Sequence, residues 1–403
     1  MARYVSPAFV YHGRPKDVSR GEISFGCGPR ELVVEVILCA RCGTDRTIYR
    51  KGHPNVDRFA PVVLGHELVA RIVEVGDRVR DLTEGIGYRE GMTLPREYLD
   101  FVPGERVVFQ SRIARYDRYG LMLIANPIAN LSFQINGGFA RFMRVTEELV
   151  RSESVLRVPD CVTDEEACLV EPAACALEST YATPHPVGVE PGGRHIYRAG
   201  VREGGSVCII GSGTVGMLYA AIALAEGAAR VVVVVRSHEK KAQITARLHG
   251  AVEAYISPRI SEEHTAESDE AEQRVVTDLM EMTDGYLFDD VVAACASVSA
   301  QRLMPRLYTR EGYAVGACFG GTHALVDGAD IDANHYRAAK TIGTSGCSTA
   351  CMKTILELLA ADRLDFTGLL ASRRFTLDDD PHEFFTTEAE GLKPALDPSG
   401  SPG

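Results

Sequence analysis

The stretch that decides the fold is Ser206-Val-Cys-Ile-Ile-Gly-Ser-Gly-Thr-Val-Gly216, in which an apolar run leads into three spaced glycines. The run Val207–Ile210 indicates a buried strand, and the apolar residues after it indicate a helix. A strand, a G-x-G-x-x-G turn and a helix in this order are typical of a dinucleotide site, where the helix N-terminus offers amide donors to phosphate. A purely structural turn is the alternative. The residues expected to bind the dinucleotide are Gly211, Gly213, Thr214, Val215 and Gly216.

Strands and helices alternate on both sides of this turn. Helical patterns cover 165–183, 215–228 and 238–250, and apolar strand patterns cover 231–235, 287–295 and 312–320. This alternation predicts parallel βαβ units and a doubly wound sheet. The acidic stretch 257–275 is expected to be a solvated excursion that ends in a helix.

The two ends of the chain have a different pattern. The first 150 residues are mostly strand-like, with β-branched residues between glycines and prolines. A strand over 339–346 and a helix over 352–363 are expected to return to this first domain.

Composition limits the classes of partner. The chain has 403 residues and a formal net charge of −12, which repels nucleic acid and anionic lipid. Its N-terminus lacks a signal-peptide pattern, and no apolar run reaches the roughly 18 residues of a spanning helix. The eleven cysteines are scattered through apolar segments and do not form a disulfide framework. We expect a cytoplasmic protein with reduced cysteines that binds neither nucleic acid nor membranes.

Three separate segments carry potential metal ligands: Cys42, the adjacent His66 and Glu67, and Glu171. Each has an ordinary alternative as a buried thiol, a core histidine, a surface charge or a helix-dipole charge. Together, a thiolate, an imidazole and one or two carboxylates suit a tetrahedral zinc site with an open position. Cys39, in C-A-R-C, ends an apolar strand and is expected to pack in the core.

The motifs C-G-T-D (42–45), G-H-E (65–67), V-E-P (170–172), G-S-G-T-V-G (211–216) and H-Y-x-x-x-x-T-I-G-T (335–344) occur in one order. In this combination the sequence resembles zinc-dependent medium-chain dehydrogenases/reductases, and most of all their sorbitol, threonine and sugar-phosphate branch. The resemblance implies an α/β fold in which a mostly β GroES-like catalytic domain, residues 1–175 and 333–403, surrounds a Rossmann cofactor domain, residues 176–332.

The resemblance also implies roles for single residues. Cys42 and His66 correspond to zinc ligands, and Glu67 and Glu171 are alternatives for the third, with one of them acting through water. Thr44 corresponds to the hydroxyl that relays the substrate proton, although Thr47 replaces the histidine often found further along that path. No cysteine lies between Cys42 and Cys161, so one catalytic zinc and no structural zinc is expected. Residues 83–101 look inserted.

The implied activity is zinc-dependent oxidation of a secondary alcohol to a ketone, with hydride passing to NAD(P). A polar, basic run at 45–51 favours a polyol, cyclitol, sugar or sugar phosphate, although those cations suit a solvated helix face equally well. A redox-neutral epimerase or lyase that retains oxidised cofactor, and a non-catalytic cofactor-binding protein, are the alternatives. A homodimer or homotetramer is expected, with the strand at 313–319 available to extend a sheet between subunits.

Cofactor choice depends on the end of the valine strand, V-V-V-V-V-R-S-H-E-K-K (231–241). An Asp or Glu there would bind the ribose of NAD, but this position is Val235. Arg236, Ser237 and Lys241, with Lys240, could instead bind the 2′-phosphate of NADP. An ordinary solvated helix start is the alternative, and Glu239 could restore NAD binding. The sequence thus favours NADP(H) over NAD(H).

Overall fold

The structure is a computed structural model, and it describes residues 3–123, 127–320, 326, 332–389 and 392–400. The chain divides into two compact units. Unit 1 comprises Met1–Pro172 and Ser348–Gly403, and unit 2 comprises Ala173–Cys347. The domain boundaries expected from the sequence, at 175/176 and 332/333, remain a prediction.

Unit 1 is built on a seven-stranded sheet with the order β10-β6-β5-β3-β20-β19, in which β9 also pairs with β3. A smaller sheet has the order β2-β1-β4. Most pairings are antiparallel, while β19 and β20 run parallel. The strands are β1 (Arg3–Tyr11), β2 (Val18–Gly26), β3 (Leu32–Ala40), β4 (Val62–Val63), β5 (Glu67–Val75), β6 (Arg106–Phe109), β9 (Phe142–Val145), β10 (Val155–Arg157), β19 (Leu370–Phe375) and β20 (Lys393–Leu396), with a separate pair β7 (Arg112–Ile113) and β8 (Ala129–Asn130).

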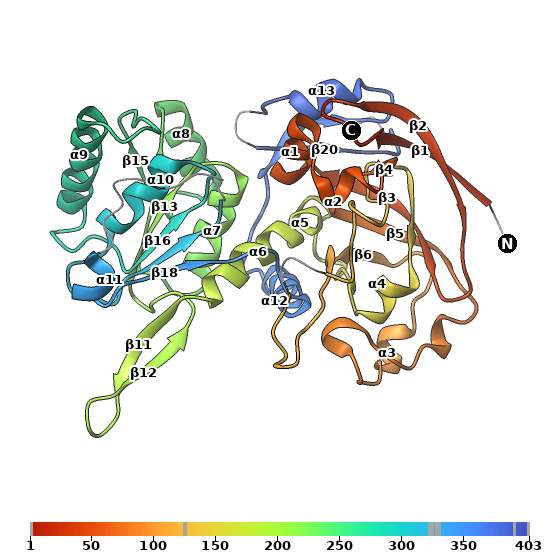
Figure 1. The fold of residues 1–403 in the computed structure, drawn as a ribbon, viewed down its shortest axis with the longest axis horizontal. Coiled ribbons are helices and arrows are strands. Elements are labelled where there is room, and N and C mark those ends of the chain that lie inside the picture. Colours follow the sequence, from red (N-terminus) through yellow and green to blue (C-terminus); the bar gives the residue numbers. More distant parts are fainter. Residues whose placement is uncertain (1–2, 124–126, 321–325, 327–331, 390–391, 401–403) are drawn as a thin grey trace. The chain divides into compact units, whose positions relative to one another are not determined.

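The two ends of the chain share the core of unit 1. β20 pairs with β3, and Phe384 of helix α13 (Pro381–Thr386) packs against Phe9 and Phe139. Burying such aromatic rings is a large stabilising contribution. The expected return of the last residues to the first domain is therefore confirmed for β19, α13 and β20, and Figure 1 shows α13 beside β1 and β2.

Short helices connect the strands of unit 1. They are α1 (Gly43–Lys51), α2 (Pro54–Asp57), α3 (Arg96–Leu99), α4 (Glu147–Arg151), α5 (Asp164–Cys168), α12 (Thr349–Ala360) and α13 (Pro381–Thr386), with 3-10 turns η1 (Val79–Asp81) and η2 (Gly87–Arg89). The segment 83–101 contains η2 and α3. It is anchored by the Tyr98 hydroxyl, which donates to the carbonyl of Val150 at 2.9 Å.

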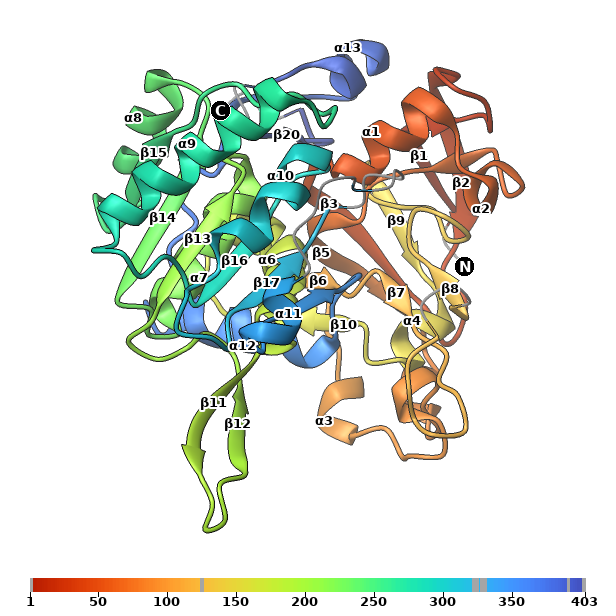
Figure 2. The same ribbon diagram turned by 60° about the vertical axis from the view of Figure 1, so that its left-hand side comes forward.

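Unit 2 contains a six-stranded parallel sheet with the order β15-β14-β13-β16-β17-β18, the order of a Rossmann fold. Figure 2 shows β14, β13, β16 and β17 side by side. The strands are β13 (Ser206–Ile210), β14 (Arg230–Val235), β15 (Glu253–Ile256), β16 (Asp290–Ala293), β17 (Val315–Cys318) and β18 (Lys340–Gly343). The helices are α6 (Val170–Tyr181), which begins in unit 1, α7 (Thr214–Ala225), α8 (His238–Arg247), α9 (Ala266–Met282), α10 (Val298–Leu303), η3 (Met304–Leu307) and α11 (Asp332–Tyr336). The doubly wound sheet is confirmed.

Two features of unit 2 differ from the sequence-based expectation. The strand expected to return to the catalytic domain, 339–346, forms β18 and pairs with β17. It therefore extends the parallel sheet, so that the edge strand is β18 and not the segment 313–319. A four-residue strand has no local feature that distinguishes one sheet from another, because pairing partners are distant in sequence.

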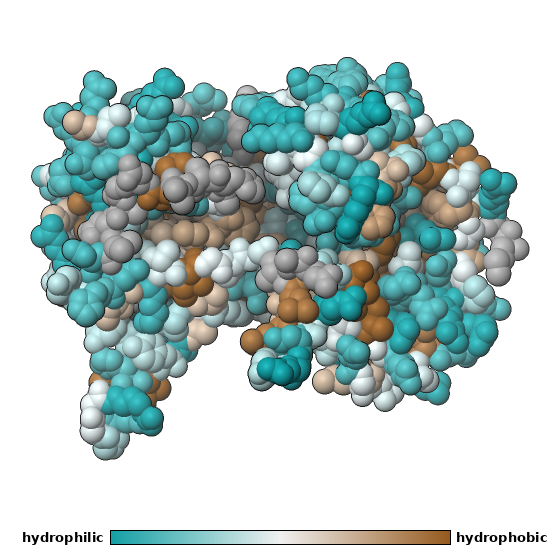
Figure 3. Space-filling model, in the orientation of Figure 1, coloured by the Kyte–Doolittle hydropathy of each residue, from teal (hydrophilic) through white to brown (hydrophobic). Residues whose placement is uncertain are grey.

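The second difference is a β-hairpin of β11 (Pro184–Val189) and β12 (His195–Ala199), which projects from unit 2 (Figure 1). Its apolar side chains Val187, Val189, Ile196 and Tyr197 are exposed. Elsewhere hydrophilic residues cover most of the face in Figure 3, with hydrophobic patches among them. Such a small, exposed strand pair lacks the buried face that makes a strand recognisable in a sequence.

Candidate metal and cofactor sites

Cys42 lies where β3 gives way to α1, and local capping holds it there. Its sulfur accepts a hydrogen bond from the backbone N–H of Thr44 at 3.4 Å. Asp45 Oδ2 accepts from the backbone N–H of Cys42 at 2.9 Å, which completes a capping box. The motif C-G-T-D therefore builds a helix start that presents a thiol from a defined position.

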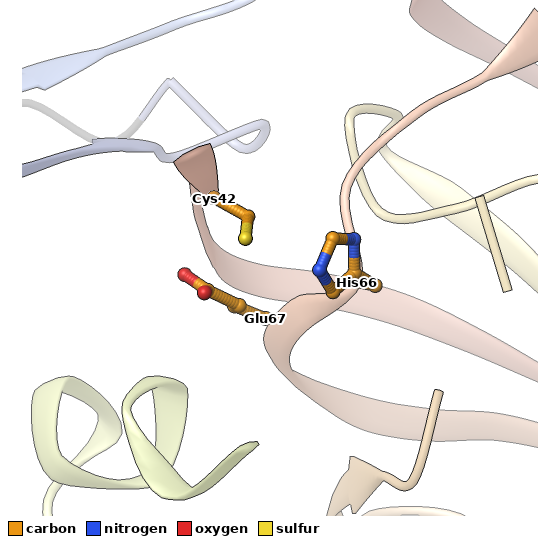
Figure 4. Close-up of side chains that lie close together, drawn as sticks. All are labelled: Cys42, His66 and Glu67. Atoms are coloured by element: carbon orange, nitrogen blue, oxygen red, sulfur yellow. The ribbon is translucent and has the colours of Figure 1, made fainter. Parts of the chain in front are cut away.

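His66 and Glu67 reach the same place from the start of β5. The sulfur of Cys42, a ring nitrogen of His66 and a carboxylate oxygen of Glu67 all lie within 4.8 Å of one another. Figure 4 shows the Cys42 sulfur between the His66 ring and the Glu67 carboxylate. His66 and Glu67 are buried, at 9% and 1% exposure. The structure thus brings together three predicted ligands from two distant segments.

Neighbouring groups orient the His66 ring. Its Nδ1 lies 3.2 Å from Ser132 Oγ and 3.6 Å from Asp45 Oδ1. Asp45 is fully buried, and its Oδ1 has no hydrogen-bond partner among the described residues. A carboxylate behind one ring nitrogen is the usual support for a histidine that binds a metal through the other. The arrangement therefore leaves Nε2 for the side of Cys42.

Acidic side chains and the Cys42 thiol dominate the electrostatics of this site. Burial alone would lower the pKa of His66, but Asp45, Cys42 and Glu171 together raise it well above the usual value. Burial raises the pKa of Glu171, and the nearby Glu67 raises it further despite the attraction of His66. A bound divalent cation would relieve this concentration of negative charge. The residues present therefore fit a zinc ion.

Glu67 has a cationic partner that its position in the sequence does not indicate. Lys393 Nζ donates to both Glu67 oxygens, at 2.6 and 2.7 Å, and both side chains are buried. Burial alone would lower the pKa of Lys393, but Glu67, Cys42 and Glu171 raise it above the usual lysine value. The pair forms because β20 lies beside β3, which in turn pairs with β5.

The other predicted residues of unit 1 lie around this centre. Glu171 is buried at the start of α6, and its Oε1 accepts from Ser111 Oγ at 3.1 Å. Thr44 is exposed in the first turn of α1. Thr47 donates from its hydroxyl to the carbonyl of Gly43 at 3.0 Å. Cys39 is completely buried in β3, as expected. All eleven cysteines are free thiols.

The basic run after Cys42 forms most of α1. Ile48 and Tyr49 are buried, and Arg46 forms an ion pair with Glu388. Arg50 and Lys51 occupy the last turn, where cations stabilise a helix C-terminus. These contacts within the protein explain the basic residues of α1 without a role in substrate binding.

Unit 2 carries the glycine loop as predicted, between β13 and α7. Gly211 has φ +130°, a conformation that L side chains rarely adopt. A Cβ at Gly216 would lie 2.0 Å from the carbonyl oxygen of Gly211. Only glycine allows α7 to pack this closely against the turn. Gly213 caps α7, which begins with Thr214 and Val215.

The valine strand also ends at Val235, where the sequence pattern predicts its end. Val235 is completely buried at the end of β14, and Arg236 and Lys241 are exposed. Ser237 caps α8, with its hydroxyl accepting from the backbone N–H of Lys240 at 3.1 Å. Glu239 Oε1 accepts from Gln243 Nε2 at 3.4 Å.

Sequence reasoning missed four residues that shape the metal site: Asp45, Ser111, Ser132 and Lys393. Asp45 could have been found, because it stands three residues after Cys42 in a capping-box pattern. Ser111, Ser132 and Lys393 have no local signal, since their partners lie 60, 66 and 326 residues away.

Among the described residues, no helix combines the length and the apolar character needed to cross a bilayer.

Comparisons with known proteins bear on both units. Residues 28–87 match the family model of the alcohol dehydrogenase GroES-like domain. Over 223 residues, 53% of each chain, the sequence is 26% identical to (R,R)-butanediol dehydrogenase of Bacillus subtilis. Over 285 residues, 71% of this chain and 68% of its relative, it is 26% identical to a sorbitol dehydrogenase of Halalkalibacterium halodurans. The match to the first of these relatives spans about half of that relative's length.

Solved structures share the fold over nearly the whole chain. A protein of Sinorhizobium meliloti 1021, described as a zinc-binding dehydrogenase bound to NADP, superposes with a TM-score of 0.74 at 20% identity, covering 98% of this chain and all of the other. The 2R,3R-butanediol dehydrogenase of Bacillus subtilis superposes with a TM-score of 0.71 at 20% identity, covering 98% and 99%. The chain is thus similar in sequence to butanediol and sorbitol dehydrogenases over part of its length, carries a segment that matches the alcohol dehydrogenase GroES-like domain, and shares its fold with solved dehydrogenase structures.

Proposed function

We propose that this protein is a zinc-dependent, NAD(P)-linked oxidoreductase that interconverts a secondary alcohol and a ketone. The observation that carries the proposal is the cluster of Cys42, His66 and Glu67 ligand atoms within 4.8 Å, supported by the carboxylate of Asp45 behind His66. Its relatives named for sorbitol, butanediol and arabinitol favour a polyol as the substrate class. Sugars, cyclitols and sugar phosphates belong to the same proposal.

Each unit contributes residues with distinct tasks. Cys42 and His66 would hold the zinc, which when bound supplies a Lewis acid for the alcohol oxygen. Thr44, exposed at the start of α1, would take the hydroxyl proton outward. The glycine loop of unit 2 would bind the nicotinamide dinucleotide, which accepts the carbinol hydride.

Glu67 and Glu171 are the two candidates for the third protein ligand. Glu67 belongs to the cluster with Cys42 and His66. Both Glu67 oxygens accept hydrogen bonds from Lys393, so direct coordination would compete with that pair. If Glu171 coordinates directly, Glu67 would act through a water. One zinc per chain is proposed, because no cysteine lies between Cys42 and Cys161 to build a four-cysteine lobe.

NADP(H) is the proposed cofactor because the exposed Arg236 and Lys241 flank a strand end that lacks an acidic residue. Replacing Arg236 with Ala should lower kcat/KM for NADP by about tenfold, the scale of a charge-assisted hydrogen bond to phosphate. NAD should be affected little. A wild-type preference for NAD, or an unchanged NADP preference in Arg236→Ala, would contradict this choice.

We further propose a homodimer or homotetramer in the cytoplasm. Among the described residues β18 is an edge strand of its sheet, and it could pair with a second copy of the chain. Eleven free thiols suit a reducing compartment. Sedimentation that gives only monomer at micromolar concentration would remove the oligomer.

The decisive experiment measures zinc content and nicotinamide reduction on a panel of ethanol, cyclohexanol, free polyols and phosphorylated sugars. Cys42→Ala should lose bound zinc and activity, whereas Cys161→Ala, which removes an exposed thiol, should keep both. A preference for ethanol would overturn the substrate class. Full activity in zinc-free Cys42→Ala would overturn the metal-dependent reaction.

A further inference from the structure

A concave site lies in unit 1, apart from the candidate ligands. It is a groove of about 470 Å³, within the size range of small-molecule pockets. The segment 83–101 forms one wall, β10 and the residues before it form the floor, and α12 forms the other wall. Tyr98, Val155, Leu156 and Leu356 give the groove an apolar lining.

The wall formed by segment 83–101 is held in place by several hydrogen bonds. The backbone N–H of Ile86 donates to the carbonyl of Arg151 at 3.1 Å, and Arg151 Nε donates back to the carbonyl of Glu84 at 2.8 Å. The backbone carbonyl of Tyr98 accepts from Arg157 Nη1 at 3.2 Å. The groove is therefore preformed, which lowers the ordering cost of binding.

A buried carboxylate lies in the floor of this groove. Glu153 is only 3% exposed and has φ +51°, a conformation that is costly for a residue other than glycine. Its Oε2 accepts from both the Tyr88 hydroxyl and Arg89 Nε. Within the described part of the chain, no hydrogen bond to its Oε1 is formed. Strained, buried and half-satisfied groups of this kind are concentrated at binding sites.

The charges around the groove have an anionic excess. The lining contains Arg89, Arg157 and Lys353 together with Glu97, Glu153 and Glu357. Arg157 is already paired with Glu105 at 2.9 Å, a residue outside the lining. Arg89 is paired with Glu153, so Lys353 alone remains to balance the exposed Glu97 and Glu357, which stand at opposite walls.

We propose that this groove binds a small organic cation with an apolar body. The apolar part would lie on Tyr98, Leu156 and Leu356, and the positive charge would lie between Glu97 and Glu357, above Glu153. The site is separate from the proposed alcohol chemistry, because none of its lining residues is a candidate metal or cofactor ligand.

Isothermal titration calorimetry on the full chain tests this with benzyltrimethylammonium, a cation that has no lone pair with which to bind a metal. Benzenesulfonate is the anionic counterpart with a similar ring. We expect one benzyltrimethylammonium per chain and no measurable benzenesulfonate binding. Because benzyltrimethylammonium cannot ligate zinc, its binding stands or falls independently of the proposed dehydrogenase activity.

Variants locate the binding. Ala360→Trp, at an exposed lining position of α12, should fill the groove and abolish binding. Glu97→Gln and Glu357→Gln should each weaken binding by up to about fivefold, the effect of one solvent-exposed charge pair. Glu90→Gln, an exposed change outside the lining, should leave it unchanged. No binding to the wild type, equal binding of benzenesulfonate, or full binding to Ala360→Trp would overturn the proposal.

Discussion

Unit 1 and unit 2 each contain a buried ion pair, and the two pairs differ in what surrounds them. In unit 2, Arg302 binds Glu272 and also donates to the carbonyls of Ser261 and Glu262. Glu272 receives a second cation, Arg306, at 2.9 Å. In unit 1, one Lys393 ammonium contacts both Glu67 oxygens, and Cys42 and Glu171 add negative charge nearby.

The difference separates a pair that holds a fold together from one that belongs to a site. In the Arg302–Glu272 pair, both side chains have further hydrogen-bonding or ionic partners. The pair attaches the loop that contains Ser261 to helix α9. The Glu67–Lys393 pair lies beside Cys42 and Glu171, so one ammonium serves three groups that carry negative charge when they are ionised. A buried charge without full compensation is costly, so a site of this kind depends on a further cation.

The largest expected effect on stability comes from breaking the Arg302–Glu272 pair of unit 2. Arg302→Met should lower the free energy of unfolding by about 3–5 kcal/mol, because it leaves the buried Glu272 with fewer partners. Arg274→Met, which breaks an exposed pair with Asp278, is the matched control and should change little. Thermal unfolding followed by circular dichroism measures both. Equal, small effects would show that the buried pair contributes no special stability.

The corresponding change in unit 1 should depend on zinc. In the presence of a chelator, Lys393→Met leaves Glu67 buried and uncompensated and should cost a similar amount, about 3 kcal/mol or more. With zinc bound, the metal supplies the missing positive charge and the loss should be smaller. Unfolding with and without zinc tests this. An identical loss in both states would contradict the distinction between the two pairs.

A smaller effect is expected when the support of His66 is weakened. Asp45→Asn removes the charge behind His66 Nδ1 while keeping an acceptor for the Cys42 backbone. Zinc affinity should fall about 10–100-fold, as for other residues that orient a metal-binding histidine. Competition with a chromophoric chelator measures this, with the exposed Asp81→Asn as control. Unchanged affinity would mean that Asp45 serves only the helix cap.

The smallest effect concerns Glu153, a buried carboxylate that accepts hydrogen bonds through its Oε2 from Tyr88 and Arg89. Burial alone would raise its pKa, but hydrogen bonds from Arg89 and Tyr88 lower the pKa below the usual value. Ionised Glu153 therefore stabilises the fold above the unfolded carboxylate pKa of about 4.3, and this contribution disappears as pH falls through the lower folded value.

Glu153→Gln should accordingly be less stable than the wild type near neutral pH by about 1 kcal/mol, the order of the net contribution of a typical hydrogen bond. The difference should shrink as the pH falls below about 4. Glu90→Gln is the control and should show no such pH dependence. A deficit in Glu153→Gln that stays constant down to acidic pH would argue against the ionised form.

Much of the fold could be predicted from local sequence. The run Val207–Ile210 followed by the glycine loop predicted a strand, a turn and a helix, because Gly211 and Gly216 satisfy steric demands that no other residue meets. Cys42, His66 and Glu67 could be selected because their residue types share one kind of metal chemistry. The wrong placement of 339–346 arose because a short strand has no local signal for its partner.

The sequence by itself determined the class of fold and the donor atoms offered to a metal, since both follow from residue types and their spacing. Only the tertiary structure decided which groups surround those donors. Lys393 reaches Glu67 across 326 residues because β20, β3 and β5 are neighbours in one sheet. The groove over Glu153 likewise exists only where segment 83–101 folds beside α12. Long-range pairing brings such groups together, and it depends on the packing of whole strands and helices, which no short stretch of sequence specifies.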